Sequence, residues 1–421
     1  MEELQSSSGS HEFRRIDYVK ITIFGLALSA LWGSLHSIIL PMRLLDFVSE
    51  SQKNTYLGMM TLIGLLLAMA VQPIAGAISD RSRFSWGRRR PYILFGTLLT
   101  LLFIPGIGLF QSYAAFFTIY CLIQISSNTA QGPFQAYIPD LVPEDRRGLA
   151  SGLKSLFEIV GGMGLIYMII FASNRFSSTG SDWLWLVLGI ISALLLVFML
   201  ITIITVKERS VPVVTQLSQF PTLKSFKIDT RENTGFILFL VSRLLFIMAL
   251  TTLQSFAFYF VQDVVGAADP AKATSELLLA VGIGLIAAVY PAGRLSDTVG
   301  RKPVLVTAGL LGASGIMMIF FTPSYGFVVA GGALQGIAGG AFLSSNWALA
   351  TDLVAKGEEA RYLGIANMAT AGGAALARLI GPVIDFFNSY SPGMGYQVML
   401  LTCFVYFLAG AALILKIKVG R

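Results

Sequence analysis

Four ionisable side chains interrupt long apolar runs of this sequence: Glu158, Arg243, Arg378 and His36. A charge in an apolar environment is costly unless it is paired or hydrated, so each group is a candidate for binding or moving charge. Glu158 and Arg243 each lie about ten residues into their runs, which is about 15 Å along a helix, so they could pair across a central cavity. A carboxylate that alternates between a desolvated site and an Arg neighbour can take up and release a proton.

Structural roles compete with these functional ones. An ion pair between Glu158 and Arg243 could instead fix helix packing permanently, and Asp385 is a competing partner for Arg378. His36 could titrate near neutral pH, or it could simply donate a hydrogen bond to a neighbouring helix. The sequence leaves these alternatives open.

Amide side chains form a second group of candidate functional residues, in the apolar run 113–138. Four of them are spaced by 4, 3 and 4 residues, which places them on one helix face: Gln124, Asn128, Gln131 and Gln135. Hydrogen bonding between helices is the alternative, but a ladder of four on one face exceeds what packing needs and favours a polar cavity. Further amides and aromatic rings lie in other apolar runs: Gln254, Gln335, Asn346, Trp32, Trp347 and Tyr259.

No pattern in the sequence points to an enzyme, a metal site or a cofactor. Cys121 and Cys403 lie in separate apolar runs and the two histidines are far apart, so neither a disulfide framework nor a metal cluster is expected. A nucleotide-binding loop, zinc-ligand spacing and a nucleophile elbow are all missing from the sequence. The net charge of +7 fits basic loops beside a membrane better than it fits a nucleic-acid partner.

The elements that position these residues must cross a membrane. Of the 421 residues, 55% are hydrophobic and only 13% are charged, whereas soluble domains carry about 25% charged residues. A soluble protein could not cover so much apolar surface. Because a crossing helix needs about 20 apolar residues, we expect an all-α integral membrane protein with twelve transmembrane helices, at residues 20–45, 55–79, 91–111, 113–138, 149–173, 182–206, 234–262, 274–295, 303–322, 325–352, 362–388 and 395–416.

The basic residues predict the orientation of these helices in the membrane, and the composition predicts how they are grouped. Of the 30 Lys and Arg residues, 24 fall on the side of the N-terminus and four on the other side, so both termini are expected in the cytoplasm. A polar segment after the sixth helix predicts a linker between two six-helix halves. The expected parts are the tail 1–19, the first half 20–206, the linker 207–233, the second half 234–416 and the end 417–421.

Three short motifs recur in both halves, at offsets of 217, 213 and 212 residues. The corresponding segments are Gly76-Ala-Ile-Ser-Asp80 with Gly293-Arg-Leu-Ser-Asp297, Gly87-Arg-Arg-Arg-Pro91 with Gly300-Arg-Lys-Pro303, and Asp140-Leu-Val with Asp352-Leu-Val. A parallel repeat of two six-helix halves is a known plan of transporters, which bind their substrate between the halves near the middle of the membrane.

The two loops that contain G-x-x-S-D and then G-R-[RK] resemble the signature loop of the major facilitator superfamily. The first copy is longer and resembles two sugar-transporting branches, the sucrose–proton symporters of plants with their animal relatives, and the glycoside–pentoside–hexuronide cation symporters. The segment Q-G-P-F-Q-A-Y-I-P-D (131–140) also resembles the sucrose–proton symporters. The resemblance implies two six-helix bundles in a pseudo-two-fold arrangement that transport by alternating access, without a cofactor.

The resemblance also implies roles for single residues. Asp80 and Asp297 would meet helix N-termini and hold the outward-open state, unless the arginines beside them only set topology and touch anionic lipid. The loop residues expected to act in this conformational change are Gly76, Asp80, Arg81, Gly87, Arg88, Arg89, Gly293, Asp297, Gly300 and Arg301. Spans 1, 4, 7 and 10 line the cavity in the superfamily, so the amides would bind sugar hydroxyls and the aromatic rings would stack on the sugar.

Departures from the family patterns narrow the choice of coupling ion. Span 2 holds no acid and span 4 holds none before Asp140, so a sodium site of the melibiose-carrier type is not expected. Asn128 stands where many proton-coupled members have Arg, and span 5 lacks the Gly-Pro motif of drug–proton antiporters. Glu158 is left as the main candidate for coupling, and uniport remains possible.

We therefore expect a monomeric secondary transporter in the plasma or inner membrane that moves a sugar or glycoside together with protons. Export of a hydrophobic or amphipathic compound and uniport are the alternatives. A membrane sensor that has lost transport is less favoured, because a scaffold does not need intact loops in both halves.

Overall fold

The structure is a computed structural model that describes residues 15–143, 146–175, 181–208, 234–353 and 359–417. These residues form helices joined by short turns, and no strand occurs among them. The sequence requires this outcome, because a helix is the way for a single apolar segment to satisfy all its backbone hydrogen bonds within a membrane. The expected linker lies almost wholly outside the described residues.

The first half of the chain forms a bundle of helices that we call the first bundle. Its elements are α1 (Arg15–Thr22), α2 (Phe24–Ser34), the π-helical turn η1 (Leu35–Ile39), α3 (Leu40–Leu44), α4 (Lys53–Asp80), α5 (Arg90–Phe103), α6 (Gly106–Leu109), α7 (Tyr113–Gln135), α8 (Tyr137–Leu141), α9 (Arg147–Arg175) and α10 (Ser181–Thr205).

The second half forms the second bundle. Its elements are α11 (Thr234–Phe260), the π-helical turn η5 (Val261–Val265), α12 (Pro270–Thr298), α13 (Arg301–Phe321), α14 (Tyr325–Asp352), α15 (Glu359–Arg378), α16 (Ile380–Asn388) and α17 (Met394–Lys416).

Eleven segments of the described chain are long and apolar enough to cross a membrane. The expected fourth span, α7, has the length with 23 residues and carries no charge, but its amides and hydroxyls lower its hydropathy. The first span begins at Arg15 instead of residue 20, and Asp17 and Lys20 pair at 2.9 Å in the part of the helix that lies in the expected tail.

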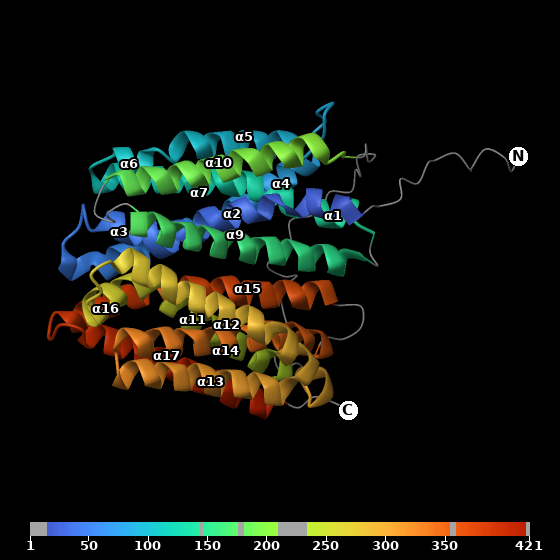
Figure 1. The fold of residues 1–421 in the computed structure, drawn as a ribbon. Helices are drawn as coiled ribbons and strands as arrows, with labels where there is room; N and C mark the ends of the chain where they lie inside the picture. Colours follow the sequence, from blue (N-terminus) through green and yellow to red (C-terminus); the bar gives the residue numbers. More distant parts are fainter. Residues whose placement is uncertain (1–14, 144–145, 176–180, 209–233, 354–358, 418–421) are drawn as a thin grey trace, which may run out of the picture.

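The two bundles lie side by side in Figure 1, α1–α10 in blue to green and α11–α17 in yellow to red. The first helix begins and α17 ends on the same side, at the right of the figure. We call this side the terminal end and the opposite side the far end. Between the bundles, α9 packs against α12 and α4 packs against α16.

Glycines permit close helix contact within each bundle. A Cβ at Gly96 of α5 would lie 2.7 Å from the carbonyl oxygen of Ser126 in α7, and a Cβ at Gly284 of α12 would lie 2.5 Å from that of Ala333 in α14. Both distances are too short for any larger residue, so the helix spacing depends on glycine there.

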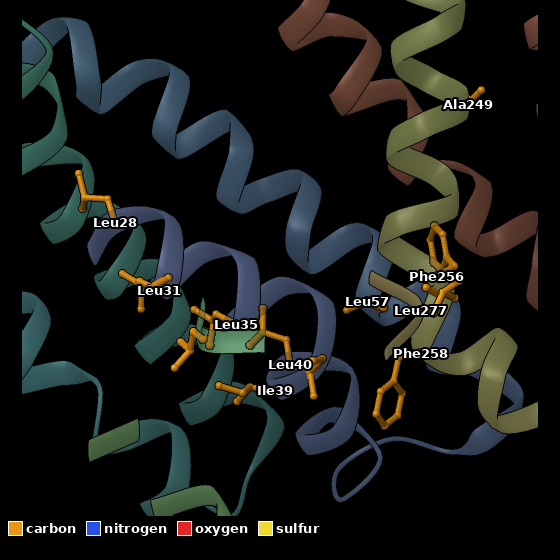
Figure 2. Close-up of a cluster of buried hydrophobic side chains, with 14 of the residues drawn as sticks. Leu28, Leu31, Leu35, Ile39, Leu40, Leu57, Ala249, Phe256, Phe258 and Leu277 are labelled. Carbon is orange, nitrogen blue, oxygen red and sulfur yellow. The ribbon is translucent and has the colours of Figure 1, made fainter. Parts of the chain in front are cut away.

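The first helical segment of each bundle contains a π-helical turn. The turn η1 carries His36, and η5 carries Asp263. Such turns are rare and often occur at functional sites. Around η1 the apolar side chains Leu31, Leu35 and Ile39 belong to a buried cluster that also includes residues of the second bundle, shown in part in Figure 2.

Candidate functional site

A cavity of about 370 Å³ lies between the two bundles. The elements α2, η1 and α9 line it from the first bundle, and α11, α12, α13, α14 and α17 line it from the second. Most of its lining residues are apolar or glycine, and its polar side chains are Ser37, Glu158, Gln254 and Gln335. Three of the predicted site residues therefore meet in one cavity, and Glu158 is the charged group among them.

Glu158 forms an ion pair with Lys154, one helical turn away, at 2.5 Å. About a third of the Glu158 side chain is exposed, so the pair is open to the cavity. From the sequence, Lys154 was counted only as one of the 24 basic residues on the side of the N-terminus. The spacing of four residues was a signal for this contact, because such residues are neighbours on a helix surface.

Arg243 lies in a cluster within the second bundle and does not pair with Glu158. Its Nε donates to Thr370 Oγ1 at 2.8 Å, Nη1 donates to Asn346 Oδ1, and the guanidinium lies 4.6 Å from the centre of the Trp347 ring. The helix α11 turns this side chain toward α14 and α15 instead of α9. The structure thus brings three predicted residues together, and Thr370 is a partner that the sequence did not reveal.

A separate polar network surrounds His36. Its Nε2 lies 3.0 Å from the hydroxyl of Tyr120, which accepts a hydrogen bond from Gln124 Nε2 at 2.8 Å. The Trp32 ring stacks on His36 with centroids 5.0 Å apart.

The amide ladder of α7 divides between two environments. Asn128 is buried, and its amide donates to Gln124 Oε1 at 3.0 Å, while Asn128 Oδ1 accepts from Gln72 of α4 at 2.6 Å. Gln131 is partly buried and Gln135 is exposed. None of the four lines the cavity, so hydrogen bonding between helices accounts for Gln124 and Asn128 in this conformation.

Arg378 and Asp385 do not pair, although the sequence made them candidate partners. Arg378 is 9% exposed, its Nη1 donates to the carbonyl of Ala374, and its Nε has no partner. Asp385 instead accepts hydrogen bonds from α4 of the first bundle. Tyr259 is also buried at the bundle interface, where its hydroxyl donates to the carbonyl of Pro41 at 2.9 Å.

Asp385 belongs to a set of contacts between the bundles that we call the far-end latch, made of Lys53, Asn54 and Thr55 with Asp263, Asp385 and Tyr396. Asp385 accepts from the Thr55 backbone N–H at 2.6 Å, the Asn54 backbone N–H at 3.3 Å and the Asn54 side chain at 2.9 Å. Lys53 pairs with Asp263 at 2.6 Å and is 2% exposed. A carboxylate at a helix N-terminus is favourable, so the far-end latch holds the bundles together.

The terminal end contains two similar triads, one in each bundle. Arg89 pairs with Asp80 and with Asp140, at 2.9 Å from the latter. Arg301 pairs with Asp297 and lies 3.5 Å from Asp352. Asp80 and Asp297 therefore contact arginines of their own bundle. The resemblance to the superfamily's signature loop had implied contacts with helix N-termini instead.

The remaining loop residues support these triads. Gly87 and Gly300 have φ angles of +132° and +103°, which L-residues rarely adopt. The N-terminus of α5 is capped by Glu208, which accepts from the Arg88 backbone N–H at 2.6 Å and from that of Arg90 at 2.9 Å. The carbonyl of Gly76 accepts from Arg89. A Cβ at Gly293 would come no nearer than 3.9 Å to its neighbours, and Arg81 is exposed. Glu208 falls at the start of the expected linker, and no sequence motif pointed to its capping role.

Metal binding has no structural support in the part of the chain that is described. No group of three or more His, Cys, Asp or Glu residues is placed to hold an ion among those residues.

Comparison with solved structures identifies the fold. A crystal structure of the nucleoside transporter NupG superposes with a TM-score of 0.73 at 14% identity, covering 96% of this chain and 100% of that one. The D-xylose–proton symporter gives a TM-score of 0.67 at 17% identity, covering 96% of each chain. The predicted twelve-helix fold of the major facilitator superfamily is confirmed by these likenesses and the eleven apolar helices.

Sequence relatives agree with this fold. The sucrose transport protein SUT1 of Oryza sativa subsp. japonica is 34% identical over 126 residues, which are 25% of this chain and 23% of that protein. The lactose permease of Leuconostoc lactis is 21% identical over 336 residues, or 73% of this chain and 51% of the permease. This chain thus spans about a quarter to a half of these relatives, all of which are transporters by name and not enzymes.

The family comparison covers nearly the whole chain. The sequence model described as MFS/sugar transport protein matches residues 22–418. Together with the membrane-length helices, this match identifies an integral, multi-pass membrane protein. The chain belongs to the MFS/sugar transport protein family of the major facilitator superfamily.

Proposed function

We propose that this chain is a secondary active transporter that moves a sugar or glycoside by alternating access, coupled to protons. The observation that carries the proposal is the cavity between the bundles, with Glu158 as its charged lining residue. The names of the relatives support the substrate class, since they include a sucrose transport protein, a lactose permease and a D-xylose–proton symporter.

The two halves, 20–206 and 234–416, would move against each other around this cavity. The terminal end would face the cytoplasm of a plasma or inner membrane, because the segments predicted from the sequence to lie on the side of the N-terminus carry 24 of the 30 Lys and Arg residues. The far-end latch would then close the outer side, in a state closed to the outside. A single chain contains both halves, so a monomer would suffice.

Glu158 would be the coupling group. In the ionised form it pairs with Lys154, and protonation would release Lys154 and change the charge at the cavity wall. Gln254 and Gln335 would bind the sugar. Gln335 lines the cavity and its buried Oε1 atom lacks a hydrogen-bond partner, which a sugar hydroxyl would supply if the amide turned toward the cavity.

Proteoliposomes provide the test. We expect added sugar to alkalinise the outside solution with the wild type and to lose this effect with Glu158→Gln. Glu50→Gln is the matched control, because Glu50 is exposed at the far end. Sugar movement without proton flux in all three proteins would indicate uniport and a packing role for Glu158.

The apolar lining favours a second candidate, export of a hydrophobic or amphipathic compound. Leu, Ile, Val and Met side chains make up much of the cavity wall, and the amide ladder lies outside it. The same vesicles distinguish the two functions, since an exporter would expel a lipophilic cation and give no response to any sugar.

A further inference from the structure

The loop between α4 and α5 is four residues longer than the corresponding loop of the second bundle. Gly87 follows Asp80 by seven positions, whereas Gly300 follows Asp297 by three. Both loops nevertheless lead into the same kind of Arg–Asp triad at the terminal end. Because the shorter loop is enough to form a triad, the additional residues of the longer loop must have another role.

Two aromatic rings and two guanidinium groups of the longer loop are exposed. Phe84 is 52% exposed and Trp86 is 38% exposed, and Arg81 and Arg83 are exposed beside them. In the part of the chain that the structure describes, no carboxylate pairs with Arg81 or Arg83, unlike the arginines of the triad. Aromatic rings together with basic residues are typical of protein segments at a membrane–water interface.

Hydrogen bonds give this loop a defined shape. The backbone N–H of Gly87 donates to the carbonyl of Phe84 at 3.2 Å, which closes a four-residue turn. Arg90 donates from Nη1 to the carbonyl of Trp86 at 3.1 Å, and Glu208 caps the helix α5 that follows. The rings and the charges are therefore presented together on one ordered loop.

The lengths of the flanking helices place the loop at the level of the lipid head groups. The helix α4 has 28 residues, so it is about 42 Å long and exceeds the hydrocarbon core of about 30 Å. The apolar segment that begins at Arg90 has 20 residues, so its length of about 30 Å just crosses that core. The loop that joins the two segments thus lies where the hydrocarbon ends.

The loop also lies at the outer edge of the first bundle. The helix α5 packs against α7 and α10 of its own bundle, and its other side exposes Phe95, Leu98, Leu99 and Leu102 to lipid. In Figure 1 the loop between α4 and α5 projects at the terminal end, on the side of the first bundle that is away from the second. Lipid head groups can therefore reach it.

We propose that this loop binds the head groups of anionic phospholipids, with Arg81 and Arg83 on the phosphates and Phe84 and Trp86 inserted beside them. The guanidinium fork matches phosphate oxygens, and aromatic rings are stable at the head-group level. Because the two guanidinium groups lack a carboxylate partner, they favour anionic over zwitterionic lipid. The second bundle does not share this site, since its shorter loop has no aromatic or basic residue between Asp and Gly. The proposal is independent of the transported molecule.

Quenching of Trp86 fluorescence by brominated lipid tests the proposal. The full chain is placed in phosphatidylcholine vesicles that contain increasing fractions of brominated phosphatidylglycerol or brominated phosphatidylcholine. The Trp86 signal is the difference between the wild type and Trp86→Phe. We expect half-maximal quenching at an at least tenfold lower fraction of brominated phosphatidylglycerol, because each Arg near an anionic surface contributes about fivefold in affinity.

Two double variants separate the loop from the overall charge. Arg81→Gln with Arg83→Gln should raise the half-maximal fraction of brominated phosphatidylglycerol to that of brominated phosphatidylcholine. Arg294→Gln with Lys416→Gln is the matched control, because it removes two exposed charges at the terminal end of the second bundle, and it should leave the curve unchanged. Equal curves for the two lipids with the wild type would overturn the proposal. An equal effect of the two double variants would also overturn it, because the basic surface as a whole would then attract the lipid.

Discussion

Replacing Asp385 with Asn should open the far end of the molecule. Asp385 accepts three N–H groups from Asn54 and Thr55, at distances of 2.6 to 3.3 Å, and it is 8% exposed. The helix α4 depends on this contact, because its own N-cap residue, Gln52, makes no side-chain capping bond. The carboxylate of one bundle thus caps a helix of the other.

The size of the effect follows from these contacts. A hydrogen bond to a charged group contributes about 1.5–3 kcal/mol, and Asn keeps the shape of Asp but turns one acceptor oxygen into a donor that faces an N–H group. If the substitution removes about 2 kcal/mol of stabilisation from the closed state and none from the open state, the equilibrium between them shifts about 30-fold toward the state with an open far end.

Spin labels measure this shift directly. Ser51→Cys and Ser389→Cys place labels on exposed positions of opposite bundles at the far end, after Cys121 and Cys403 have been replaced. In lipid discs, Asp385→Asn should move the distance distribution toward longer values than in the otherwise wild-type protein.

Asp269→Asn provides the matched control. Asp269 also caps a helix at the far end, accepting from the Lys272 N–H at 2.9 Å, but both residues belong to the second bundle. Its loss should lower the melting temperature without changing the distance. An unchanged distribution in Asp385→Asn, or an equal change in Asp269→Asn, would refute the reasoning that the far-end latch controls opening.

Two further substitutions test the terminal end by thermal melting. Gly300→Ala should cost about 1–3 kcal/mol, because its φ of +103° disfavours any side chain although the nearest atom is 3.8 Å away; Gly326→Ala, in an open helical position, should be neutral or stabilising and is its control. Glu208→Gln should cost about 1–2 kcal/mol by weakening the cap of α5, and an unchanged melting temperature would show that the cap is dispensable.

Hydrophobicity predicted the helices well, because a membrane leaves an apolar segment little alternative to a helix. The recurring motifs were equally informative, since they correspond to the triads around Arg89 and Arg301. The weakest apolar segment, α7, is also the one with the most amides. Its lower hydropathy was a sign that it packs against polar groups of α4.

The contact partners of the ionisable side chains were harder to predict than their depth in the membrane. Counting residues along a helix places Arg243 and Glu158 at similar depths, but it does not say which way each side chain faces. The packing of α11 against α15 turns Arg243 toward Thr370, so the expected pair does not form. The Lys154–Glu158 contact was accessible from sequence alone, because both residues lie on one helix four positions apart.

Contacts between the bundles escape a search for repeats, and the far-end latch shows why. At the offset of 217 residues, Asn54 of α4 corresponds to Ala271 of α12, which has no side-chain donor. The N-terminus of α12 is capped within its own bundle by Asp269, whereas that of α4 is capped by Asp385 from the other bundle. A sequence repeat reveals the contacts that form within each bundle. The groups that join the two bundles differ between the halves, so they have to be found in the structure.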